Sequence, residues 1–274
     1  MAGGTSPGAR PGNEAPAFDT SIAHSARVYD YWLGGKDNYA ADRAAAEQVI
    51  EVRPAIRTEV QANRAFLGRA VRFVAEEAGI RHFLDMGTGL PSANNTHEVA
   101  QSVAPDSRIV YVDNDPIVLS HARALLNSTP EGATAYLDAD LREPDTILDA
   151  AAQTIDLGQP VAIMLVAVLH HIPEQDDAGG LVARFRDATV AGSYLVISHP
   201  AADIQTAKVA EVSRRYNASV ATGQTRRTGA EVRAFFGSWE ILEPGVTQTV
   251  LWRPDEPTEL TEPVPMWAGV ARKP

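Results

Sequence analysis

The stretch from Phe83 to Ser92, FLDMGTGLPS, constrains the fold more than any other part of the chain. An apolar pair runs into Asp85, and two glycines, Gly87 and Gly89, follow closely. Glycine lacks a Cβ atom, so it can adopt positive φ angles and lets a ligand approach the backbone. We therefore expect a strand that ends in a tight turn, followed by a helix from Ser92 whose free N–H groups face a ligand.

A second predicted strand favours a nucleotide ligand over a purely structural turn. Residues 108 to 112 (RIVYV) have the continuous apolar character of a buried strand, which ends at Asp113. Asp115 can then cap a helix that has Pro116 at its first position, where proline is tolerated. In nucleotide-binding βαβ units, an acidic residue at the tip of the second strand accepts hydrogen bonds from ribose hydroxyls. Asp113 is our candidate for that role.

The glycine pattern differs from the dinucleotide fingerprint. That fingerprint is Gly-x-Gly-x-x-Gly, with the third glycine allowing close helix packing. Ser92 stands at the third position here, and Asp85 stands where a dehydrogenase usually has an apolar residue. An NAD-dependent dehydrogenase therefore remains an alternative, but a disfavoured one.

Five segments together give a specific resemblance. Asp85-x-Gly87-x-Gly89, followed by Asp113, resembles the class I methyltransferases that depend on S-adenosylmethionine (SAM). FLDMGTGLPS together with YDYWLGGKDNYAADR (29 to 43), VYVDNDP (110 to 116), DADLREP (138 to 144) and LHHIP (169 to 173) resembles the actinobacterial S-adenosyl methyltransferase family of unassigned substrate. The similarity runs from about residue 21 to the C-terminus, and its N-terminal motif is much more specific than the glycines.

Further apolar segments complete the expected sheet. Residues 134 to 137, 161 to 168 and 193 to 198 are predicted strands, and helical segments separate them. Strands and helices in this alternation predict a doubly wound parallel α/β sheet. The resemblance implies a Rossmann-like, seven-stranded form, in which residues 239 to 242 and 267 to 271 make an antiparallel C-terminal hairpin.

We expect three regions along the chain. Residues 1 to 20 are rich in Gly, Pro and Ala, which predicts a disordered tail. Residues 21 to 78 are predicted as a helical N-terminal arm that acts as a lid over the cofactor, and residues 79 to 274 as the Rossmann-like core. The Pro-rich link between the last two strands carries Trp252 and Arg253, which we expect to border an acceptor pocket.

The resemblance implies SAM as the cofactor and assigns residues to its parts. An acidic residue after the third strand accepts from the adenine amino group, and the backbone N–H of its neighbour reaches a ring nitrogen. An arginine on the helix before the first strand can fork onto the methionine carboxylate. The cofactor-binding residues that we predict are Asn38, Tyr39, Arg64, Asp85, Gly87, Gly89, Asp113, Asn114, Asp140 and Leu141.

Two histidines at the end of the fourth predicted strand are the catalytic candidates. Methyl transfer from a sulfonium needs mainly alignment in a dry pocket, so a base is optional. If the small-molecule acceptor uses a hydroxyl, His170 or His171 can take its proton, because imidazole titrates near neutrality. Alternatively, one histidine caps the next helix and the other lines the pocket. A protein that binds SAM or S-adenosylhomocysteine (SAH) as a sensor, without catalysis, remains a second alternative.

Composition excludes several other functions. The net charge of −11 repels nucleic acid and membrane surfaces. The chain has no cysteine, which removes disulfides and a thiol nucleophile and fits a cytoplasmic protein. The longest apolar run, residues 161 to 169, is too short to span a bilayer. We predict no metal site, because His170 and His199 follow the fourth and fifth strands where metal-dependent methyltransferases have acidic ligands.

Overall fold

The computed structural model describes residues 19–125, 127–220, 223–256 and 262–274. Most of the tail expected at residues 1 to 20 therefore lies outside the described residues. The strands are β1 (His82–Met86), β2 (Arg108–Asp113), β3 (Ala133–Asp138), β4 (Val161–Val166), β5 (Tyr194–Pro200), β6 (Glu240–Ile241), β7 (Thr247–Gln248) and β8 (Met266–Arg272). The α-helices are α1 (Ser25–Leu33), α2 (Ala40–Val52), α3 (Ile56–Arg72), α4 (Thr96–Val103), α5 (Pro116–Leu125), α6 (Pro144–Ala151), α7 (Ala178–Asp187), α8 (Thr206–Ser219) and α9 (Gly229–Ala234).

The strands form one mixed sheet in the order β3-β2-β1-β4-β5-β8-β6. Strands β1 to β5 are parallel, and β8 runs antiparallel to β5 and β6. The doubly wound sheet with an antiparallel C-terminal end is thus confirmed. Within the described residues, the sheet has one strand more than the seven expected, because Thr247 and Gln248 form β7 in the link between the hairpin strands and also pair with β8.

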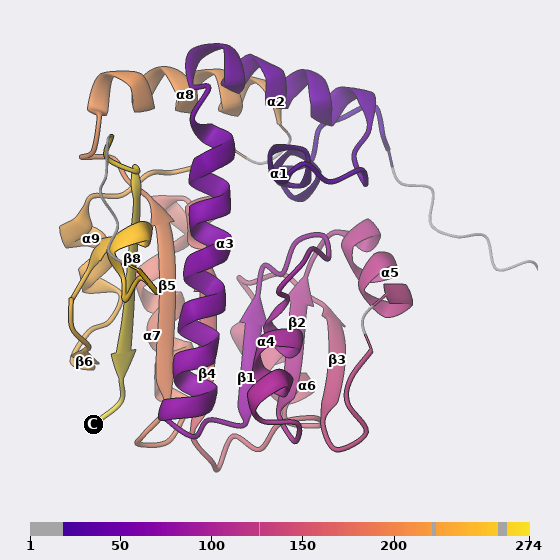
Figure 1. Ribbon diagram of the computed structural model, residues 1–274, viewed down its shortest axis with the longest axis vertical. Coiled ribbons are helices and arrows are strands. Elements are labelled where there is room, and N and C mark those ends of the chain that lie inside the picture. Colours follow the sequence, from indigo (N-terminus) through magenta and orange to yellow (C-terminus); the bar gives the residue numbers. More distant parts are fainter. Residues whose placement is uncertain (1–18, 126, 221–222, 257–261) are drawn as a thin grey trace, which may run out of the picture.

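Helices cover both faces of the sheet because successive side chains of a strand point in opposite directions. On β1, Leu84 and Met86 belong to a buried cluster that includes α6, α7 and α9. Phe83 belongs to a second cluster, with α3 and α4. Figure 1 shows α3 crossing the front of the sheet. All six residues of β4 are buried, as expected for a central parallel strand.

The N-terminal arm packs against α8 rather than only against the sheet. Trp32 lies in a buried cluster with residues of α2, α3 and α8, and its ring centroid is 6.0 Å from that of Tyr216. Gly34 ends α1 in the left-handed conformation, at a φ of 85°, as its position predicts. Figure 1 shows α1, α2 and α8 gathered at one end of the sheet. None of the described helices is long and apolar enough to cross a membrane.

The helix expected from Ser92 begins four residues later, so that expectation is wrong. Asn95 and Glu98 form a capping box at the start of α4, in which Glu98 accepts from the Asn95 N–H at 2.8 Å. Asn95 also accepts from the backbone N–H of Ser92, and Asn94 has a positive φ of 61°. The cap fixes the helix start at Thr96 and leaves a long loop after the glycine turn.

Candidate active site

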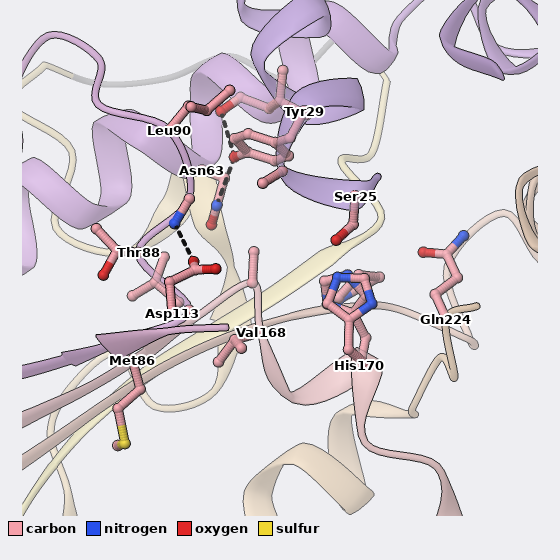
Figure 2. Close-up of a pocket in the computed structure, with 18 of the residues that line it drawn as sticks. Ser25, Tyr29, Asn63, Met86, Thr88, Leu90, Asp113, Val168, His170 and Gln224 are labelled. Atoms are coloured by element: carbon pink, nitrogen blue, oxygen red, sulfur yellow. Dashed lines mark hydrogen bonds between the residues drawn. The ribbon is translucent and has the colours of Figure 1, made fainter. Parts of the chain in front are cut away.

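A cavity lies at the carboxyl ends of the parallel strands, bordered by residues of α1, α3 and α8. Its volume of about 250 Å³ far exceeds the ~10–15 Å³ that one water molecule requires on the same measure. Figure 2 shows Asp113 on one side of this cavity and His170 with Gln224 on the other. The open α/β sheet therefore has a ligand-sized cavity at the edge where such sheets bind ligands.

The two positions in the turn after β1 require glycine for different structural reasons. Gly87 has a φ of 70° and Gly89 a φ of 66°, both in the left-handed region. A Cβ atom on Gly87 would lie 2.2 Å from Cγ2 of Val168, whereas nothing lies within 4 Å of one on Gly89. Gly87 thus lets the turn after β1 approach the segment that follows β4, whereas at Gly89 the positive φ, rather than a close protein neighbour, favours glycine.

This difference gives a prediction about stability. Gly87→Ala combines left-handed strain with a clash and should lower the free energy of unfolding by roughly 2–5 kcal/mol. The matched variant Gly89→Ala suffers only the strain, and should lose about 1–2 kcal/mol. Urea unfolding of the three proteins measures both values. Equal losses in the two variants would contradict the close packing of Gly87 on Val168.

Asp85 is a buried carboxylate beneath this turn. Its side chain is only 5% exposed, and its Oδ2 accepts a hydrogen bond from Thr96 Oγ1 at 2.6 Å. Burial raises the pKa of Asp85 to about 6, and the charge of Asp113 adds to the rise. The Thr96 hydrogen bond and the Arg64 charge oppose it. A carboxylate kept in such a site favours a cationic partner.

Asp113, at the end of β2, holds the turn in place. Its Oδ2 accepts from the Gly89 N–H at 2.9 Å, which Figure 2 shows, and its Oδ1 accepts from the Asp115 N–H at 2.9 Å. Burial raises the pKa of Asp113, while both backbone hydrogen bonds lower it. The carboxylate therefore joins the ends of β1 and β2, and it lines the cavity.

The residues predicted after β2 and β3 also line the cavity. Asn114, Asp140 and Leu141 all border it. Asp140 forms an ion pair with Arg142 at 3.0 Å, which fixes the loop after β3. Asp138, at the end of the strand itself, is exposed and does not border the cavity.

Arg64 of α3 reaches the same side of the cavity. Its Nη2 donates to the carbonyl oxygens of Ala93 and Asn94, both at 3.1 Å. Its Nε is buried, and no described residue accepts a hydrogen bond from it. A buried guanidinium N–H without an acceptor suits an anionic group of a ligand.

Asn38 and Tyr39 do not line the cavity. Asn38 instead donates to Asp30 at 2.8 Å and ties the loop after α1 to that helix. Tyr39 is the N-cap residue of α2, and the Arg27 guanidinium lies 5.4 Å from its ring centroid. The described contacts of these two residues are structural, and their contact with a cofactor stays a prediction.

The arm contributes residues of α1 and its N-cap, His24, that the sequence interpretation missed. His24, Ser25 and Tyr29 border the cavity. The Tyr29 hydroxyl accepts from Asn63 Nδ2 at 2.9 Å and donates to a backbone oxygen of α3, as Figure 2 shows. The sequence of this nine-residue helix does not indicate which of its faces meets the cavity. Packing of α1 against α8 determines that face.

His170 and His171 lie in the cavity wall directly after β4. Their ring centroids are 4.0 Å apart. Nδ1 of His170 is buried without a hydrogen-bond partner among the described residues, whereas Nδ1 of His171 lies 3.3 Å from the Gly223 oxygen. Burial lowers the pKa of His170 well below its usual range and that of His171 to about 4. Both imidazoles are therefore neutral at pH 7, and burial makes each a weaker base than a free imidazole.

The side of the cavity beyond His170 has a mainly apolar wall. Arg226, Gln224 and Glu59 are polar exceptions on this side. Trp252 and Arg253 do not border it: Trp252 is fully buried against Phe66, and the Arg253 guanidinium lies 4.2 Å from the ring centroid of Phe73. The apolar lining comes from Trp32, Leu33, Ile56, Val212, Tyr216 and Met266.

Comparisons with known proteins agree on one family. The family model described as S-adenosyl methyltransferase matches residues 11–274. A DUF574 family protein from Streptomyces avermitilis is 47% identical, covers 93% of this chain and 99% of its own, and superposes with a TM-score of 0.90. A proposed methyltransferase from Thermobifida fusca is 43% identical, with coverages of 93% and 96% and a TM-score of 0.86.

More distant structures support the fold alone. Mitomycin 7-O-methyltransferase MmcR is 16% identical, covers 93% of this chain and 73% of its own, and has a TM-score of 0.51. No curated protein matches the chain. Since the family model spans nearly the whole sequence and two similar structures superpose closely, the chain belongs to the SAM-dependent S-adenosyl methyltransferase family.

Proposed function

We propose that the protein binds SAM in this cavity and transfers its methyl group to an oxygen or nitrogen atom of a small molecule. One observation carries the proposal: Asp85, Asp113 and Asp140, from the ends of the first three strands, line a single cavity with the glycine turn. SAM is cationic at its sulfonium and its ammonium group, and an acidic wall favours such a ligand.

Each part of SAM has a matching group in the wall. Asp113 accepts from the ribose hydroxyls, with Asn114 beside it. Asp140 accepts from the adenine amino group, and the Leu141 N–H donates to a ring nitrogen. At the other end of the ligand, Asp85 accepts from the ammonium group. Arg64, whose Nε lacks an acceptor among the described residues, binds the carboxylate.

The chain's own contribution to the reaction is alignment and proton transfer. When bound, SAM supplies a methyl group that its positive sulfur has already activated for in-line displacement. Residues of α1 and α8 border the cavity and exclude water from it. The neutral His170 accepts the proton that a hydroxyl acceptor loses as its oxygen bonds to the methyl carbon. His170 is favoured over His171, because Nδ1 of His170 has no hydrogen-bond partner among the described residues.

This assignment predicts unequal effects for the two histidines. His170→Asn should lower kcat by about 10²-fold or more, because it removes the base and leaves the cofactor contacts in place. His171→Asn is the matched control and should lower kcat less than about tenfold. Single-turnover methyl transfer measures the rates, and calorimetry with SAH checks that cofactor affinity is kept. A larger loss in the His171 variant would reverse the assignment.

Two other functions are less well supported. A sensor that only binds SAM needs no acceptor pocket, whereas the apolar wall beyond His170 borders a further part of the cavity. A dinucleotide needs a helix N-terminus directly after the glycine turn. Here α4 begins only at Thr96, and Asp85 would face the pyrophosphate.

Titration calorimetry tests the proposal. The purified protein is titrated with SAM, SAH and NAD, and then incubated with labelled SAM and a small-molecule extract. We expect SAM and SAH to bind, NAD not to bind, and label to appear in a small-molecule product. Binding of NAD alone would refute the proposal, and SAM binding without transfer to any fraction would favour the sensor.

A further inference from the structure

Arg226 is the one arginine on the apolar side of the cavity beyond His170, within the described residues. Its Nε donates to Ser213 Oγ of α8 at 2.8 Å, and its Nη1 donates weakly to the Ala201 oxygen at 3.4 Å. No described residue accepts a hydrogen bond from its Nη2. Arg226 therefore borders the cavity and has a donor group that no described residue uses.

The backbone around Arg226 fixes its position relative to the proposed base. The Thr225 N–H donates to the His170 oxygen at 2.7 Å. Arg227, the next residue, is buried and donates to the oxygens of Leu169 and Ile172 at 3.0 and 2.9 Å. These bonds tie the segment on both sides of Arg226 to the end of β4. Arg226 is thus held at a set place beside His170.

The charge of Arg226 has no direct counterion among the described residues. The acidic group that acts on it most is Glu59, which is already paired with Arg53 at 2.5 Å. Burial lowers the pKa of Arg226 to about 10, and Arg53 contributes to that change. The side chain remains protonated at pH 7. Glu59 also borders the cavity, but Arg53 balances its charge, and His170 and His171 are neutral at pH 7. The net charge of this side, counted with Arg53, is therefore about +1.

We propose that the methyl acceptor is a small carboxylic acid, whose carboxylate Arg226 binds while its apolar body packs among the side chains of α1, α3 and α8. This inference rests on the proposed function and specifies its substrate class. A monoanion matches a single uncompensated cation. A phosphate dianion would need a second free cation, and Arg53 is neutralised by Glu59. Because burying a charge against an apolar wall is costly, we expect the rest of the acceptor to carry no charge.

Binding of acid and amide pairs tests the inference. The protein, saturated with SAH, is titrated with 4-hydroxybenzoate, 4-hydroxyphenylacetate and 3-(4-hydroxyphenyl)propanoate, and with the primary amide of each. We expect at least one acid to bind about tenfold or more tightly than its amide, because the carboxylate gains a charge-assisted hydrogen bond. Arg226→Gln should remove that preference, and Arg226→Lys should retain part of it.

A matched variant separates direct binding of the carboxylate by Arg226 from a general effect of the protein's positive charge. Arg214 lies on the exposed face of α8 and does not border the cavity, so Arg214→Gln removes the same charge and should keep the preference for the acid. SAH affinity, measured for every variant, checks that the fold and cofactor site persist.

Three results would overturn the inference: no acid binds better than its amide, Arg226→Gln keeps the preference, or Arg214→Gln loses it equally. In each case SAH still binds, and the proposed function stands. If SAH does not bind the parent protein, the proposed function itself is wrong, and the inference falls with it.

Discussion

Replacing Asp113 by alanine is expected to weaken SAH binding by roughly a hundredfold or more. The parent carboxylate accepts two hydrogen bonds from the ribose in our proposal, at ~1.5 kcal/mol or more each. It also holds the Gly89 and Asp115 N–H groups, so its loss releases the turn that faces the cofactor. Isothermal titration calorimetry with SAH measures the change.

Two further variants make this result interpretable. Asp138 is the register partner of Asp113 on β3, but it is exposed and outside the cavity lining. Asp138→Ala should therefore keep the affinity within about twofold. Asp113→Asn keeps one acceptor oxygen and should lose less than Asp113→Ala. If Asp113→Ala folds and binds SAH within twofold of the parent, Asp113 does not hold the ribose.

Replacing Asp85 by asparagine is expected to stabilise the ligand-free protein at pH 7. Burial raises the pKa of Asp85 from 3.8 to about 6 in the folded state, a difference that corresponds to about 3 kcal/mol. Because the folded pKa lies above the unfolded one, ionisation destabilises the fold as the pH rises from about 4 through 6. The asparagine cannot ionise and should gain about 1–3 kcal/mol at pH 7, and little at pH 4.

Urea unfolding at the two pH values measures this gain. Asp138→Asn is the matched control, because it removes the charge of an exposed carboxylate and should leave the stability within about 0.5 kcal/mol. In the Asp85→Asn variant the amide oxygen can still accept the hydrogen bond from Thr96, so the comparison isolates the charge. A loss of stability at pH 7 would show that Asp85 is better paired than its burial indicates.

The same variant should bind SAM more weakly at pH 7, by about tenfold or more, since a charge-assisted hydrogen bond to the ammonium group is lost. For the parent, affinity should fall as the pH drops below about 6, because the protonated Asp85 no longer attracts a cation. Calorimetry between pH 5 and 8 follows this change. The SAM affinities of the parent and the Asp85→Asn variant should become similar at low pH. A ratio of the two affinities that stays constant with pH would contradict the role of Asp85.

The sequence was sufficient for the parallel strands of the sheet and for the acidic side of the cavity. Continuous apolar runs such as residues 161 to 166 are typical of central parallel strands, and the carboxyl ends of such strands meet at one edge. Asp85, Asp113 and Asp140 each lie at or just after the end of a strand, so the topology alone brings them to the same cavity. The glycine turn between them follows from local backbone chemistry.

The mainly apolar side of the cavity could not be predicted, because long-range packing forms it. Tyr29 and Arg226 are far apart in the sequence, and only the contact of α1 with α8 places both at the cavity. Asn38 and Tyr39 follow a Gly-Gly pair that indicates a close approach to a ligand. In the structure their side chains stabilise the loop after α1 and the start of α2. The start of α4 was predictable, since Asn95 and Glu98 have the spacing of a capping box.

A crystal structure of the protein with SAH tests the central claim most directly. We expect the adenosine between Asp113 and Asp140, the amino-acid tail at Asp85 and Arg64, and the sulfur atom directed toward His170. Electron density for SAH outside this cavity, or none at a saturating concentration, would contradict the claim.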